Sequence, residues 1–227
     1  KKNEIDRIDI SSISNLNVDG LIISNPNNPN GQTFSEDELV YIYNYCESNS
    51  VTLISDEIYH GIEFGNSVNS MLNYGKNAIV INSFSKFFCM PGWRLGWVII
   101  PETLTNNFLK LSQNLFISSG NIAQYSALKV FECINDLKNI VKEYHLTRDR
   151  VDKILSKTSI IKYRNPSGAF YFYLDISKTN LDSFEFVKKL MNETGVVLTP
   201  GMDFDKKYGK KTVRLSFSSE TSVVIEA

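Results

Sequence analysis

The chain has 227 residues, a formal net charge of −1 and 42% hydrophobic residues, values that are ordinary for a globular protein of one or two domains. The near-neutral charge gives no electrostatic case for binding to nucleic acid or to an anionic membrane surface. The apolar runs are too short to span a bilayer, and no signal-peptide pattern opens the chain. The three cysteines are widely spaced and form no CxxC pair, which argues against a disulfide framework or a zinc site. These features predict a reducing, cytoplasmic location and no metal.

The first candidate ligand site follows the first predicted strand. Residues 1–19 are polar and weakly patterned, and we expect them to end a segment that began earlier. The run GLIIS at 20–24 predicts a short buried strand, and NPNNPNG at 25–31 is dense in turn-forming residues. Prolines and asparagines alone indicate only a tight loop. Because open α/β sheets bind ligands beyond the carboxyl ends of their strands, this position favours a binding loop.

A second polar group follows the next predicted strand. The sequence SEDE at 35–38 is a capping box, and it predicts a helix that runs through Cys46. The run VTLIS at 51–55 predicts a strand, and Asp56 comes directly after it. A carboxylate at a strand end is about as often a helix cap or a loop acid as a functional group.

The segment 83–97, SFSKFFCMPGWRLGW, carries the strongest chemical signal. It follows the apolar run AIVI at 78–81, which predicts a buried strand, and it leads into another apolar run at 95–100. Lys86 thus lies between a core strand and a turn, whereas lysine side chains normally lie on solvated faces. For an SxSK pattern alone, a surface lysine beside a serine-rich turn remains an alternative.

Three neighbours of Lys86 suit a phosphate group. Ser83 and Ser85 supply hydroxyl donors, and Arg94 supplies a rigid cationic fork. An amine beside a phosphate site is what a phosphate-bearing aldehyde cofactor requires, because the amine forms an imine while the other groups hold the phosphate.

The remainder of the chain predicts helices followed by an α+β segment. Pro101 precedes a predicted helix at 102–116, and 122–156 is mostly helical with a weak stop near Asn135. The expected elements after these are strands at 160–163, 169–176, 196–199 and 212–217 and a helix at 183–193. Arg214, in the middle of the last strand, is unfavourable there without a carboxylate partner, which leaves open an edge-strand salt bridge or a ligand carboxylate.

Read together and in order, these motifs resemble those of the fold-type I, pyridoxal-phosphate-dependent aminotransferases of class I/II. The matching stretches are NPNNPNG, DEIY, SFSKFFCMPGWRLGW, PSGAFYFYLDI, PGMDF and TVRLSF, and they extend along nearly the whole chain. Asn30 stands where the family usually has threonine. The chain resembles only the C-terminal part of such an enzyme, since a glycine-rich phosphate turn and an aromatic that stacks on the cofactor ring are absent. The sequence therefore leaves open whether it is a fragment and whether it binds cofactor alone.

The resemblance implies an α/β fold. Residues 1–140 would form part of a large cofactor-binding domain, with a mostly parallel sheet covered by helices on both faces. Residues 141–227 would form an incomplete α+β small domain. The family also implies a homodimer.

The resemblance also implies the roles of individual residues. Lys86 would carry pyridoxal 5′-phosphate as a Schiff base and act as the catalytic residue. The other expected cofactor-binding residues are Asn28, Asp56, Tyr59, Ser83, Ser85 and Arg94. Asp56 would keep the pyridine nitrogen protonated, and Asn28 and Tyr59 would contact the ring hydroxyl. Arg214, with Asn28, would bind the substrate α-carboxylate.

The implied activity is transfer of an amino group between an α-amino acid and a 2-oxo acid. Two alternatives remain at this point. A lyase, decarboxylase or synthase on the same scaffold would use the same residues, whereas an aminotransferase-like effector domain of a transcription regulator would require a basic DNA-binding domain before residue 1. The sequence does not determine which amino donor and acceptor are used.

Overall fold

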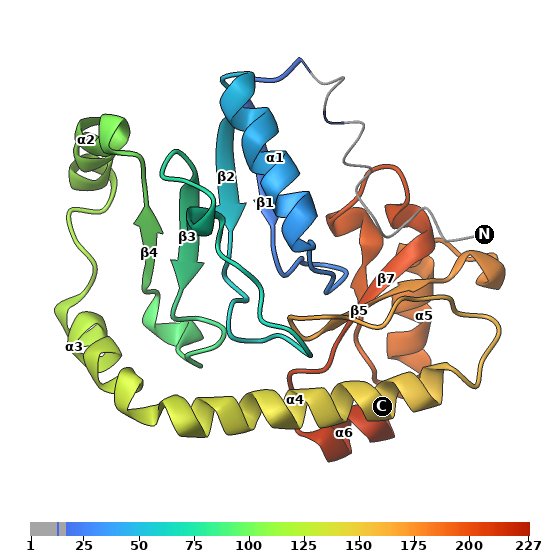
Figure 1. Cartoon of the computed structure of the whole chain (residues 1–227). Coiled ribbons are helices and arrows are strands. Elements are labelled where there is room, and N and C mark those ends of the chain that lie inside the picture. Colours follow the sequence, from blue (N-terminus) through green and yellow to red (C-terminus); the bar gives the residue numbers. More distant parts are fainter. Residues whose placement is uncertain (1–12, 14–16) are drawn as a thin grey trace. The chain divides into compact units, whose positions relative to one another are not determined.

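The computed structural model describes residue 13 and residues 17–227 (Figure 1). The expectation for residues 1–19 therefore falls almost wholly outside the described residues. No helix in the described part of the chain is long and apolar enough to cross a membrane.

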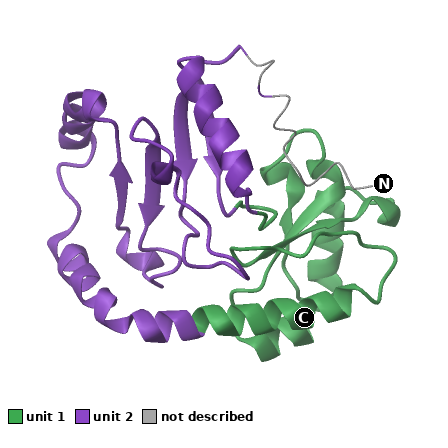
Figure 2. Ribbon diagram, in the orientation of Figure 1, with its two compact units in different colours: residues 1–7, 27–32, 140–227 green, residues 8–26, 33–139 purple. Residues whose placement is uncertain are grey.

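The chain forms two compact units, which are coloured separately in Figure 2. Among the described residues, unit 1 contains 27–32 and 140–227, and unit 2 contains 13, 17–26 and 33–139. The unit boundary near residue 140 falls within one helix. The division into a large and a small domain remains a proposal.

Unit 2 is built on a four-stranded sheet in the order β1-β2-β3-β4. The strands are β1 (Gly20–Ser24), β2 (Thr52–Asp56), β3 (Ile79–Ser83) and β4 (Gly96–Ile99). The first three are parallel and β4 is antiparallel to β3. The parallel register pairs Ser24 with Asp56 and Asp56 with Ile81, so the carboxyl ends of these strands lie along one edge.

Helix α1 (Glu36–Ser48) supplies much of the core of unit 2. Ser35 caps it as the sequence predicted, because its side chain accepts from the Glu38 N–H while the Glu38 carboxylate accepts from the Ser35 N–H. The buried side chains of α1 join those of the strands in one apolar cluster, whose members include Leu39, Ile42, Leu53 and Val80.

Three further helices follow β4 along the chain. They are α2 (Thr105–Leu115), α3 (Asn121–Val130) and α4 (Ile134–Leu155). The mostly helical stretch expected at 122–156 is interrupted by a 3-10 turn at Phe131–Cys133, close to the stop signal expected near Asn135.

Unit 1 contains an antiparallel sheet in the order β5-β7-β6. Its elements are β5 (Tyr171–Asp175), α5 (Ser183–Thr194), β6 (Thr199–Pro200), β7 (Thr212–Ser216) and α6 (Thr221–Glu226). Phe172 and Phe217 are fully buried, with their ring centres 5.4 Å apart. The mostly parallel sheet of unit 2 and the small antiparallel sheet of unit 1 together confirm the expected α/β class with a small α+β part.

Two of the strands predicted in unit 1 are shorter in the structure than the sequence indicated. The strand expected at 160–163 is a single bridge, because only Lys162 exchanges backbone hydrogen bonds with Asp175 (3.1 and 2.7 Å). The strand expected at 196–199 pairs only from Thr199 onwards, and Val197 is 69% exposed. An apolar run forms a strand only where a neighbouring strand is available to pair with it.

We predict that Ile42→Ala lowers the free energy of unfolding by about 2–5 kcal/mol, because Ile42 is fully buried in the apolar cluster and its removal leaves a cavity. Val40→Ala on the same helix is the control, since Val40 is 37% exposed and its removal costs well under half as much. Urea denaturation measures both; equal losses would contradict the described packing of α1.

Candidate active site

Lys86 lies in the turn that joins β3 to β4. Backbone hydrogen bonds run from the Phe84 N–H to the Leu95 carbonyl (3.1 Å) and from the Met90 N–H to the Phe84 carbonyl (3.0 Å). A third, from the Cys89 N–H to the Lys86 carbonyl (3.0 Å), closes the turn on the lysine itself. The turn is therefore anchored by strands at both ends, and the base of the lysine side chain has a defined position.

Aromatic side chains pack beside this turn. The Phe84 ring centre lies 4.9 Å from that of Phe88 and 5.1 Å from that of Trp97. Phe131 contacts Phe88 at 5.6 Å, edge to face. Such packing stabilises the turn from one side.

The two serines of the predicted phosphate site are brought together. The Ser83 hydroxyl lies 2.9 Å from the Ser85 hydroxyl and accepts a hydrogen bond from the Ser85 N–H (3.0 Å). Arg94 follows in the same connection with a left-handed backbone (φ 53°) and an exposed side chain, which donates to the Pro91 carbonyl at 2.8 Å. The structure thus brings the two serine hydroxyls together, whereas the Arg94 guanidinium is hydrogen-bonded to a carbonyl of its own loop.

Asp56 and Tyr59 occupy the end of β2 and the turn after it. One Asp56 carboxylate oxygen accepts from the Ile58 N–H (3.1 Å), which shapes this turn. Tyr59 is only 3% exposed, and the Lys86 amine lies 5.6 Å from the centre of its ring. The structure therefore brings the lysine and the predicted tyrosine together.

The buried carboxylate of Glu57 stabilises this segment through contacts that the sequence alone did not identify. Glu57 is 3% exposed; it accepts from the Ser55 hydroxyl (3.0 Å) and from the Met71 N–H (2.8 Å). Its other oxygen lies 3.5 Å from Nδ1 of His60. These bonds attach the end of β2 to the 3-10 turn at Met71–Asn73. The only sequence signal was a second acidic residue directly after a strand.

In unit 1, Arg214 is near the middle of β7, as predicted. Its Nη1 donates to the side-chain oxygen of Asn28 at 2.7 Å, although the two residues are 186 positions apart. Its Nη2 donates to the Thr199 hydroxyl at 3.3 Å. Among the ion pairs of the described residues, none includes Arg214, so the edge-strand salt bridge that the sequence left open is not found there.

Gly31 explains why Asn28 reaches Arg214. The Gly31 carbonyl accepts from the N–H groups of Ser167 (2.8 Å) and Gly168 (2.9 Å), which joins the NPNNPNG loop to the PSG turn. Gly31 has a φ of +64°, and a Cβ there would lie 2.8 Å from the Gly168 carbonyl oxygen. Only glycine fits both the backbone angle and the close approach.

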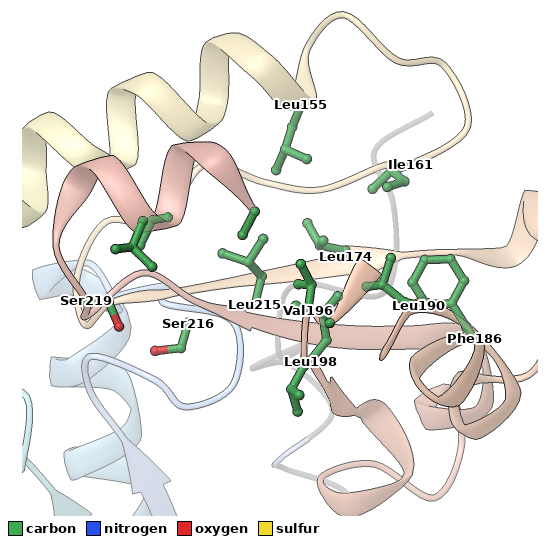
Figure 3. Close-up of a pocket in the computed structure, with 15 residues that line it drawn as sticks. Leu155, Ile161, Leu174, Phe186, Leu190, Val196, Leu198, Leu215, Ser216 and Ser219 are labelled. Atoms are coloured by element: carbon green, nitrogen blue, oxygen red, sulfur yellow. The ribbon is translucent and has the colours of Figure 1, made fainter. Parts of the chain in front are cut away.

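Unit 1 also contains an apolar cavity of about 400 Å³ (Figure 3). Its lining includes Leu174 of β5, Leu190 of α5 and Leu215 of β7, together with Ser216 and Ser219. No lining residue has a charged side chain, so the cavity is not a candidate for amine or carboxylate chemistry.

The profile "Aminotransferase class I and II" matches residues 3–227. The chain belongs to this family. Members of class I and II use pyridoxal 5′-phosphate as their cofactor.

Individual relatives agree with this assignment. The chain is 34% identical to the valine–pyruvate aminotransferase of Mycobacterium tuberculosis, over 92% of this chain and 55% of that protein. It is 38% identical to the (5-formylfuran-3-yl)methyl phosphate transaminase of Methanocaldococcus jannaschii, over 88% of this chain and 53% of the relative. The chain thus spans about half the length of the curated relatives that it matches.

Solved structures of aminotransferases also match most of the chain. The crystal structure of an aminotransferase from Mycobacterium tuberculosis has a TM-score of 0.91 and 32% identity, covering 96% of this chain and 58% of the other. A mutant of Thermus thermophilus aspartate aminotransferase has a TM-score of 0.89 and 25% identity, over 96% of this chain and 61% of the other.

We predict that Gly31→Ala destabilises unit 1 by about 1–3 kcal/mol, because it imposes a strained backbone angle and a clash with the PSG turn. Gly65→Ala is the matched control: Gly65 also has a positive φ (+124°), but nothing lies within 4 Å of its added Cβ. Urea denaturation compares the two. A loss at Gly31 no larger than that at Gly65 would mean that the close approach is not formed.

We also predict a pH effect from His60. Burial lowers the pKa of His60 below its ordinary value of 6.5, a shift that the nearby Glu57 carboxylate and the Asn25 backbone partly oppose. Because the unfolded chain then binds the proton more readily, stability falls as the pH drops below 6.5 towards the folded-state pKa. Unfolding measured between pH 5 and 8 should show this slope in the wild type and a weaker one in His60→Gln. An unchanged slope in the variant would contradict the assignment.

Proposed function

We propose that the protein is a pyridoxal-phosphate-dependent aminotransferase that moves an amino group between an α-amino acid and a 2-oxo acid. The observation that carries this proposal is the Lys86 amine, held in a strand-anchored turn 5.6 Å from the ring of buried Tyr59. When bound, the cofactor supplies an aldehyde that condenses with amines and a ring that withdraws electrons.

The donor set in unit 2 fits such a cofactor. The paired hydroxyls of Ser83 and Ser85 would bind its phosphate, with Arg94 released from the Pro91 carbonyl to add charge. Asp56, at the carboxyl end of β2, would pair with the protonated ring nitrogen. Tyr59 would hydrogen-bond the ring hydroxyl, a role that the family resemblance also gives to Asn28 of unit 1.

Lys86 and Arg214 would act on the substrate. The Lys86 amine would take the Cα proton of the substrate as general base and return a proton as general acid. Arg214, with Asn28, binds the substrate α-carboxylate and thereby orients the Cα–H bond.

Several finer features belong to the same proposal. The names of the relatives indicate amino-acid donors and 2-oxo acid acceptors, without fixing which ones are used here. A homodimer and a cytoplasmic location are further parts of the proposal. A lyase on the same scaffold differs only in which bond at Cα is broken, so product analysis separates the two.

We predict that Lys86→Ala abolishes the long-wavelength absorption of lysine-bound cofactor and lowers turnover by at least about 10³-fold, because the variant lacks both the attachment point and the general base. The matched control is Lys76→Ala, which removes an exposed lysine of the same unit. The measurement uses the full-length protein, loaded with cofactor and mixed with single amino acids.

Release of a 2-oxo acid with conversion of the cofactor to its aminated form supports an aminotransferase and identifies its donor. Release of carbon dioxide or of a side-chain fragment would indicate a lyase or decarboxylase instead. If Lys86→Ala kept the absorption band, the assignment of the lysine would be wrong.

A further inference from the structure

The guanidinium group of Arg214 lies over two aromatic rings. Its central carbon is 4.3 Å from the ring centre of Tyr171, on β5, and 4.6 Å from that of Phe204, which follows the 3-10 turn Gly201–Asp203. All three residues belong to unit 1. Guanidinium groups are weakly hydrated and planar, so they stack on aromatic faces more readily than ammonium groups do.

The charge of Arg214 is otherwise unbalanced in the described part of the chain. Its two side-chain acceptors, the Asn28 amide oxygen and the Thr199 hydroxyl, are neutral. Its Nε atom is buried, and no described residue accepts a hydrogen bond from it. A buried N–H without an acceptor costs free energy, and so does a cation without an anion, which indicates that this group is kept for an anionic ligand.

A flexible arginine would be a poor receptor for a planar carboxylate. Its side chain must lose rotamer freedom when a ligand fixes it. Packing against the two rings restricts that freedom before the ligand arrives, and the hydrogen bonds to Asn28 and Thr199 set the orientation of the guanidinium plane. The donors that remain point within this plane, where a carboxylate can accept them.

We propose that Tyr171 and Phe204 are positioning residues that act through Arg214, and that their aromatic faces, not the Tyr171 hydroxyl, create its affinity for a carboxylate. This inference rests on the proposed function, because it assumes that Arg214 receives the substrate α-carboxylate. It adds Tyr171 and Phe204 to the residues on which the proposed reaction depends, and it holds that both must be aromatic.

The test uses the full-length protein and two small probes of nearly equal shape. Acetate carries the carboxylate and acetamide is its neutral counterpart, and ¹³C-NMR line broadening of each measures binding. The variants are Phe204→Leu and Tyr171→Leu, which remove a ring, and Phe204→Tyr and Tyr171→Phe, which keep one. Arg214→Lys shows the signal expected when the guanidinium itself is lost.

We expect the wild type to bind acetate and not acetamide. Each leucine variant should bind acetate about three- to tenfold more weakly, the range typical of one cation–π contact, while the aromatic replacements stay within about twofold. Circular dichroism and urea denaturation check that each variant is folded. If Tyr171→Leu does not fold, Phe204→Leu decides the outcome, since Phe204 is only partly buried and its ring contacts the same guanidinium group.

Two results would overturn the inference. Folded leucine variants with wild-type acetate affinity would show that the rings do not prepare the guanidinium. Equal binding of acetate and acetamide would show that Arg214 does not select a carboxylate. The absorption of lysine-bound cofactor, recorded on the same samples, tests the proposed function separately: its absence together with ring-dependent acetate binding would reject the function and retain this inference.

Discussion

The parallel pairing of β1, β2 and β3 is the constraint on which the cofactor residues depend. Because Ser24 pairs with Asp56 and Asp56 with Ile81, the chain leaves all three strands at the same edge of the sheet. Asp56 ends one of these strands, and the turn with Lys86 follows another. Loops beyond the carboxyl ends of parallel strands are where open α/β sheets bind ligands.

Buried polar groups maintain this arrangement in both units. In unit 2, the Glu57 carboxylate is bonded to a hydroxyl and a backbone N–H, and it neighbours His60. In unit 1, Arg214 has only neutral acceptors and two aromatic faces. The Glu57 carboxylate finds its partners within the protein and therefore supports structure, although Nε2 of the neighbouring His60 is buried without a hydrogen-bond partner among the described residues. Arg214 has no anionic partner in the described part of the chain, which is the physical basis for proposing a ligand there.

Membership of the class I and II aminotransferases is consistent with both observations, but the chain spans only about half the length of its curated relatives. Family membership and the described geometry therefore bear on different questions. Membership identifies the cofactor that the family uses, whereas the contacts of Lys86, Tyr59 and Arg214 indicate how this chain's own residues would use it.

The sequence by itself determined the strands and caps whose signals are local. The strand GLIIS, the capping box at Ser35 and the arginine on the TVRLSF strand were predicted from neighbouring residues, because strand periodicity and capping act over a few positions. The ordered motifs also identified the family. The eight predicted site residues remain proposals in their roles; seven of them lie at strand ends or in turns and loops, and Arg214 lies within β7.

Only the tertiary structure decided which distant groups meet. The contact of Asn28 with Arg214 depends on the attachment of Gly31 to the turn at Ser167, and the stacking of Tyr171 on Arg214 depends on the pairing of β5 with β7. The failure of 160–163 to form a full strand has the same origin. Contacts between residues far apart in sequence follow from chain topology, and no pattern within a short window encodes them.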